Sequence, residues 1–167
     1  MNQNDLLERI QNLLLMGNRI VECPAEPIVI PGIGTGAAYI ANDVMGTLVK
    51  IAVPKSGEIR SATFWDMDDE GLQYDLEIFK HSITQVADNG AWALSDIDSL
   101  GFVHELNFVS FDDHGVCQTS KITNIGVAYT APEGYLYVQC VARGAHNIAA
   151  GNEPRFQIQI MPVPLDY

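Results

Sequence analysis

The chain has 167 residues, of which 47% are hydrophobic and 18% are charged, and its formal net charge is −12. These values predict one folded domain that needs no disulfide or metal, and the negative field disfavours nucleic acid as a partner because phosphate binding depends on Lys and Arg. The three cysteines lack the paired spacing of a disulfide framework, and we expect no signal peptide, no membrane-spanning segment and no membrane partner.

The first element in chain order is a predicted helix over Asn4–Leu15, the only segment with a strong helical period. The apolar residues that form its stripe are Leu6, Leu7, Ile10, Leu13 and Leu14. A helix of about three turns is marginal in isolation, so this face must pack on its own domain or on a neighbouring subunit.

Residues 18–38 differ in composition from the segments on either side. Three prolines interrupt a short apolar strand, Ile28–Ile30, and three closely spaced glycines come after it. Because proline cannot occupy a central strand, we interpret this segment as an extended connector. The sequence thus predicts an N-terminal helix and arm over 1–38 and a β-sandwich domain over 39–167. We expect Ile28, Val29 and Ile30, together with the Leu stripe, to contact other subunits.

From Tyr39 onward the hydrophobic pattern has a period of two, which is typical of strands. The expected strands are Thr47–Val53, Glu58–Trp65, Leu72–Phe79, Val103–Phe111, Cys117–Ile122, Ile125–Tyr129, Tyr135–Ala142 and Phe156–Met161. Short strands separated by turn residues predict an all-β domain, either a β-sandwich or a jelly-roll-like fold. One helical turn is expected at Ser95–Gly101, capped by Ser95 or Asp96.

One acidic motif resembles a calcium-binding loop. Asp66, Asp68 and Glu70 stand at alternate positions before Gly71, and Glu77 comes at the spacing of the last ligand. The flanks alternate like strands and not like helices, however. A solvated acidic hairpin turn is therefore the favoured interpretation, and calcium binding stays an open alternative.

Other catalytic or metal-binding patterns are not recognised in the sequence. The histidines, His81, His104, His114 and His146, are scattered without ligand spacing. No serine or cysteine stands in a nucleophile motif. We therefore expect a non-enzymatic protein without metal or cofactor.

Several segments, taken in order, carry a resemblance to a known group. They are Tyr39–Gly46 (YIANDVMG), Trp65–Asp68, Leu76–Phe79, Thr84–Asp98 (TQVADNGAWALSDID), Asn124–Tyr129, Gly134–Tyr137, Val141–Gly144 and Phe156–Ile160. Together they resemble small tailed-phage virion structural proteins of the capsid decoration, or head cement, type. The arm, Met1–Ala38, departs from that pattern.

The resemblance implies a protein of the capsid surface, assembled in the host cytoplasm, that binds the major capsid protein and stabilises the shell. We expect a homo-oligomer, most simply a trimer on a local threefold axis. Asp and Asn side chains in Asp88–Asp98 are expected to fix a loop, which either serves as a rigid contact surface or only joins two strands.

Two other functions remain possible from the residues alone. The first is a carbohydrate- or receptor-binding β-sandwich of a virion tail, using Trp65, Trp92 or the paired Tyr135 and Tyr137 as stacking surfaces. The second is a small β-sandwich enzyme, which would need histidines and carboxylates to converge in space.

Overall fold

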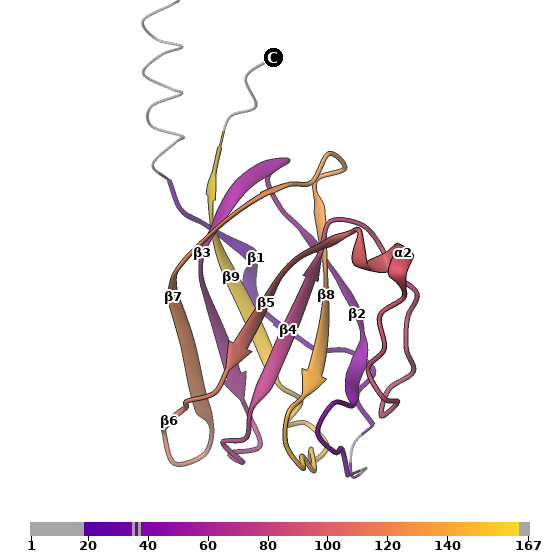
Figure 1. Ribbon diagram of the computed structural model, residues 1–167. Helices are drawn as coiled ribbons and strands as arrows, with labels where there is room; N and C mark the ends of the chain where they lie inside the picture. The colour runs from indigo at the N-terminus through magenta and orange to yellow at the C-terminus, as the bar shows by residue number, and fades with distance from the viewer. Residues whose placement is uncertain (1–18, 35, 37, 164–167) are drawn as a thin grey trace, which may run out of the picture.

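The computed structural model describes residues 19–34, 36 and 38–163, which fold as two antiparallel sheets packed face to face (Figure 1). In chain order the elements are β1 (Val21–Val29), β2 (Val44–Ala52), β3 (Ser56–Asp66), β4 (Tyr74–Phe79), α2 (Asp96–Ser99), β5 (Phe102–Phe108), β6 (Asp112–Asp113), β7 (Gln118–Thr130), β8 (Tyr135–Ala142) and β9 (Arg155–Pro162). The expected all-β sandwich is confirmed, whereas the expected helix at Asn4–Leu15 lies outside the described residues.

The strands pair in a nested order. One sheet runs β1-β9-β3-β7-β6 and the other β2-β8-β4-β5. Apart from the short β6, the first strand pairs with the last, the second with the next to last, and so on inward to the β4–β5 pair. Nearly every pairing therefore joins segments that are distant in sequence.

The core lies between the sheets and agrees with the period-two pattern. Phe156, Ile158 and Ile160 of β9 are fully buried, while the residues between them are partly exposed. Each such side chain contributes roughly 1.5–3 kcal/mol on burial. An aromatic group fills one part of the core, with the Phe64 ring centroid 4.5 Å from that of Tyr74.

The segment expected to be a connector is built into the sandwich. Val21–Val29 forms β1, the edge strand beside β9, and its register shifts between Cys23 and Ile28. An edge position suits the prolines at 24 and 27, since no neighbouring strand needs their missing N–H groups. Ile30 is fully buried in the chain's own core. A separate arm is still a prediction for residues 1–18.

Apart from the short β6, which was not expected, the other strands occur where the alternation indicates them, with one merger. The two segments expected at Cys117–Ile122 and Ile125–Tyr129 form the single strand β7. Asn124 and Gly126, at φ of 59° and 72°, absorb the register shift that lies between Ile59 and Ser61 on β3, and the strand stays continuous. The helical turn is confirmed as α2, with Ser95 as its N-cap.

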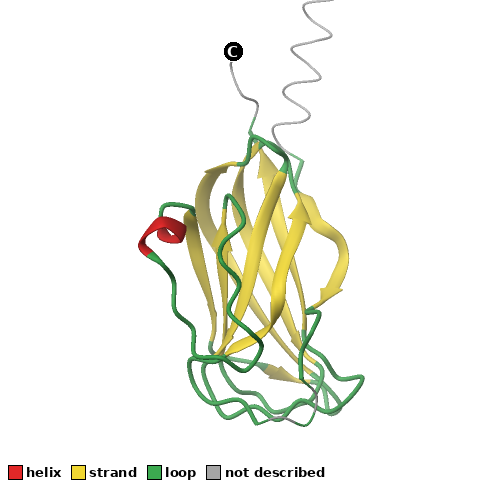
Figure 2. Ribbon diagram, turned by 90° about the vertical axis from the view of Figure 1, so that its right-hand side faces the viewer, coloured by secondary structure: helices red, strands yellow, loops and turns green. Residues whose placement is uncertain are grey.

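The long β4–β5 connection, residues 80–101, is here named the covering loop. It descends from the upper end of the sandwich in Figure 1, reaches the start of β2, and returns through α2 to β5 (Figures 1 and 2). Within the described part of the chain, no helix has the length and apolarity needed to cross a bilayer.

Candidate functional site

The covering loop is attached to the sheet by main-chain hydrogen bonds. Asn89 N donates to Val44 O and Val44 N donates to Gly90 O, both at 2.8 Å, and Trp92 N donates to Asn42 O at 2.7 Å. The loop thus extends the edge of β2 for a few residues, although it contains little regular structure.

Asp88 joins the loop to two other segments through its carboxylate. Oδ2 accepts a hydrogen bond from Gly34 N at 2.8 Å, and Oδ1 accepts from Gly46 N at 2.6 Å and from the Tyr39 hydroxyl at 2.8 Å. Burial and the neighbouring carboxylate raise the pKa of Tyr39, so the phenol keeps the proton that it donates. Gly46 has φ of +70°, and a Cβ there would overlap the Pro31 carbonyl oxygen.

Asp98 fixes the returning half of the loop. Its carboxylate accepts from the Ser95 hydroxyl at 2.8 Å and from Thr84 N at 3.2 Å, and its N–H donates back to Ser95 Oγ at 3.1 Å. The Ser95 hydrogen bond lowers the pKa of Asp98, so the carboxylate stays ionised as an acceptor.

The turn that Asp98 holds presents two large apolar side chains to solvent. Ile97 is 77% exposed and Leu100 is 73% exposed. They stand three residues apart on one side of the helical turn, which places them side by side. We name Ile97 and Leu100 the α2 knob.

The outer face of the four-stranded sheet contains buried charges. Asp75 accepts from Asn107 Nδ2 at 2.9 Å and pairs with Arg143 Nε, while Arg143 Nη2 lies 3.8 Å from Glu77 Oε1. Glu105 stands directly opposite Glu77 in the β4–β5 register. Burial first, and then Glu105, raises the pKa of Glu77 to about 7.

Gln139 stands on the other side of Glu77 and is fully buried. Its Nε2 donates to Cys140 O at 3.2 Å, and among the described residues its Oε1 has no hydrogen-bond partner.

Burial raises the pKa of the Cys23 thiol, to about 11, and also raises the pKa of the Cys140 thiol. These two thiols are therefore protonated and unreactive near neutral pH.

The calcium-like motif at the lower end serves as a clamp between loops. Asp66 is fully buried and accepts from Gly71 N at 2.8 Å; Asp68 accepts from Ala149 N at 3.1 Å and Glu70 from Asn147 N at 3.0 Å. The turn is therefore braced against the β8–β9 connection and is not simply solvated. Glu77 lies instead on β4, between Glu105 and Gln139 of the neighbouring strands. No group of three or more His, Cys, Asp or Glu in residues 19–34, 36 and 38–163 could hold a metal ion.

His146 completes this clamp. Its ring is buried 4.1 Å from that of Tyr74, with Nε2 3.0 Å from Gln73 O and Nδ1 3.3 Å from Glu70 Oε2. Burial lowers the pKa of His146, which favours the neutral ring donating through Nε2. Among the described residues, the other three histidines form no metal-binding group with His146. They are His81, His104 and His114.

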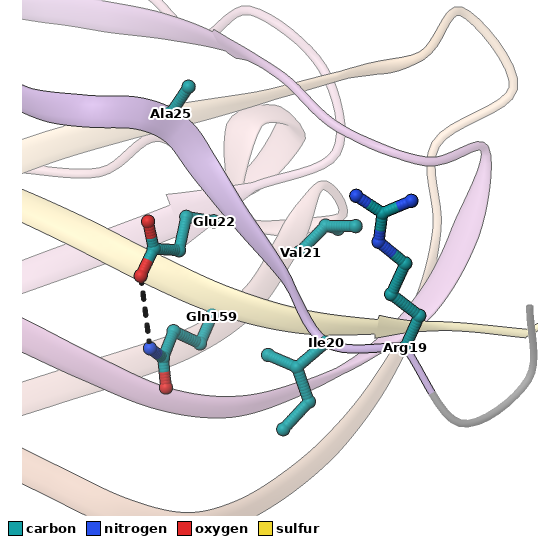
Figure 3. A pocket seen from close by; sticks show the side chains of 6 residues that line it. All are labelled: Arg19, Ile20, Val21, Glu22, Ala25 and Gln159. Carbon is teal, nitrogen blue, oxygen red and sulfur yellow. Dashed lines mark hydrogen bonds between the residues drawn. The ribbon is translucent and has the colours of Figure 1, made fainter.

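Two surface hollows lie at the upper end. The larger, about 520 Å³, is on β1 where the N-terminal segment joins it, and a Gln159 Nε2 to Glu22 Oε1 hydrogen bond of 3.4 Å crosses it (Figure 3). The smaller, about 220 Å³, lies between β5 and β7. Its lining residues are Lys80, Phe102, Val103, Ala128, Tyr129 and Thr130. We name it the β5–β7 groove.

The residues expected at an interface are only partly described. The Leu stripe, Leu6 to Leu14, lies outside the described residues. Ile28 is half-buried against the core, Val29 is exposed, and Ile30 is fully buried. Ile30 thus packs within its own chain, and an interface role for Ile28 and Val29 stays a prediction.

The aromatic side chains do not form one stacking platform. Trp65 is on β3 and Tyr135 is on β8, which belong to different sheets. The Lys50 Nζ atom lies 3.9 Å from the Tyr135 ring centroid and so occupies a face of that ring. Trp92 packs on Phe79, with ring centroids 6.3 Å apart.

Sequence reasoning identified the covering loop by its Asp and Asn residues but missed the buried charges of the four-stranded sheet. Acidic residues alternate with apolar ones at Asp75, Glu77 and Glu105. Such alternation ordinarily predicts that the acidic side chains lie on a solvent-exposed face of the sheet. The one available signal was Arg143, a lone cation just after an apolar strand.

Comparison with known proteins gives no relative from which a function could be transferred. No family model, no curated protein and no solved structure matches this chain.

Proposed function

We propose that this chain is a structural protein of a phage virion, a head decoration protein that binds and stabilises the major capsid shell as a homo-oligomer. The nested strand pairs support a jelly-roll assignment, an architecture used by viral capsid and lectin domains. Because one fold serves many functions, the proposal depends on the site and not on the fold.

The observation that carries the proposal is the α2 knob on a fixed loop. Two large apolar side chains are held in solvent by a turn whose Asp98 carboxylate accepts two hydrogen bonds. Exposed apolar groups of this kind mark contact sites. A surface that is already ordered also loses little conformational entropy on binding, which suits a protein that clamps neighbouring subunits.

The charged groups of the loop support a role without catalysis. Asp88 and Asp98 use their carboxylates to accept hydrogen bonds from the chain's own N–H and hydroxyl groups. In this proposal the two residues hold the contact surface in a fixed conformation. The partner that binds this surface is the major capsid protein.

The test is co-sedimentation with empty capsids of the phage that encodes the protein. Leu100→Asp should weaken capsid binding by about tenfold or more, because a charge replaces an apolar contact. Val116→Asp is the matched control, since Val116 is 81% exposed in the β6–β7 turn at the other end of the sandwich. Equal binding by both variants and the parent would reject the knob as the contact. Absence of parent binding would favour the receptor- or carbohydrate-binding alternative.

A further inference from the structure

The β5–β7 groove opens at one long edge of the sandwich. β5 ends one sheet, and β7 lies against it in the other. Phe102 is 44% exposed beside the groove, and Val103 and Ala128 add apolar surface. Lys80 is the one charged residue of its lining. The groove thus presents one cation beside a small apolar surface, which suits a segment that carries a carboxylate next to apolar side chains.

Lys80, one of four lysines in an acidic chain, supplies the positive charge of the groove. With a net charge of −12, most of the surface repels another copy. Lys80 is therefore a contact that an acidic segment can make at this edge.

The chain itself has such a segment outside the described residues. Residues 1–18 place Asp5 and Glu8 among the apolar residues of the Leu stripe. They join the sandwich at Arg19, beside β1. β1 contacts β2, so it lies at the edge of the sandwich opposite to β5 and β7. Three strand spacings, roughly 14 Å, separate β1 from β7 in the sheet.

We infer that the β5–β7 groove binds the N-terminal segment of a second copy, with Leu6 and Leu7 against Phe102 and Val103 and with Asp5 or Glu8 facing Lys80. Copies placed edge to edge bring the donor edge of one beside the acceptor edge of the next. Such head-to-tail contacts close into rings when the rotation permits. The inference rests on the proposed homo-oligomer and specifies how its subunits join.

A mixing experiment tests this arrangement with full-length chains. The donor variant carries Leu7→Asp and Ile10→Asp, and the acceptor variant carries Lys80→Glu and Phe102→Asp. By light scattering, the parent should have an oligomer mass and each variant alone a monomer mass. A mixture of the two variants should form a one-to-one pair, since the intact segment of the acceptor variant can enter the intact groove of the donor variant.

Several results would overturn the inference. They are a monomeric parent, a variant that keeps the parent mass, and a mixture that stays monomeric. Far-UV circular dichroism and thermal unfolding of each variant show whether its fold is intact.

A charge exchange gives a second test that does not disturb the core. Lys80→Glu alone should weaken self-association by about threefold or more, and adding Asp5→Lys with Glu8→Lys should restore it. Lys121→Glu, an exposed charge reversal on β7, is the matched control and should leave self-association unchanged. No rescue, or an equal effect of the control, counts against the groove.

Capsid binding separates this inference from the proposed function. If the mixture fails while the parent still co-sediments with capsids, only the mode of assembly is wrong. If the parent assembles as described but does not co-sediment with capsids, the decoration role is wrong. The inference that the groove joins the subunits then still holds.

Discussion

The two sheets present outer faces with the same alternation but different surroundings. On the five-stranded sheet, Arg60 and Glu58 form an ion pair of 2.6 Å with side chains 42% and 24% exposed. On the four-stranded sheet, Asp75 and Glu77 are nearly fully buried beside Arg143.

The difference teaches that solvent exposure, and not residue type, decides how much a charged residue on a sheet contributes to the free energy of unfolding. An exposed pair is screened by water and contributes little. A buried carboxylate has lost its hydration, so removal of its partner leaves a charge that nothing offsets. Variants matched between the two faces should therefore differ strongly in stability.

The largest effect is expected at Arg143. Arg143→Met leaves Asp75 and Glu77 buried without their cation and should lower the free energy of unfolding by about 3 kcal/mol. Arg60→Met on the open face should change it by less than about 1 kcal/mol. Urea unfolding of both variants at pH 8 measures the two values, and equal losses would refute the comparison.

A smaller effect is expected where the covering loop is attached. Asp88→Asn places an amide NH₂ against one of the N–H groups of Gly34 and Gly46, which should cost about 2 kcal/mol. Asp113→Asn is the control, since the Asp113 carboxylate accepts from Gly115 N on an exposed turn. The measurement is again urea unfolding, with hydrogen exchange at Trp92 N as a local readout. Unchanged exchange at Trp92 would show that Asp88 does not hold the loop.

The third effect, similar in size to that at Asp88, depends on pH. Burial and Glu105 raise the pKa of Glu77 from 4.5 to about 7, so its contribution to stability is fully present below pH 4.5 and is lost as the pH rises through about 7. Glu77→Gln should remove this loss and stabilise the protein at pH 9 by on the order of 2 kcal/mol relative to the parent. Glu105→Gln should lower the pKa of Glu77 in a carbon-13 carboxyl titration. A Glu77 resonance that titrates near pH 4.5 in the parent would contradict this account.

Residues near in sequence made much of the candidate site predictable. The cap of α2 depends on Ser95 and Asp98, three positions apart, and a local hydrogen bond is enough to indicate it. The three donors to the Asp88 carboxylate come from positions 34, 39 and 46, and no local pattern connects them. Sequence reasoning therefore indicated a fixed loop but not its attachment.

The sequence by itself determined the all-β class and most strand positions, because side-chain alternation is a property of each strand alone. Only the tertiary structure decided that β1 is an edge strand, that the strand pairs are nested, and that Asp75 and Glu77 are buried. Each of these depends on contacts between segments far apart in the chain. Alternation places a side chain on a face, but it does not say whether water or another segment covers that face.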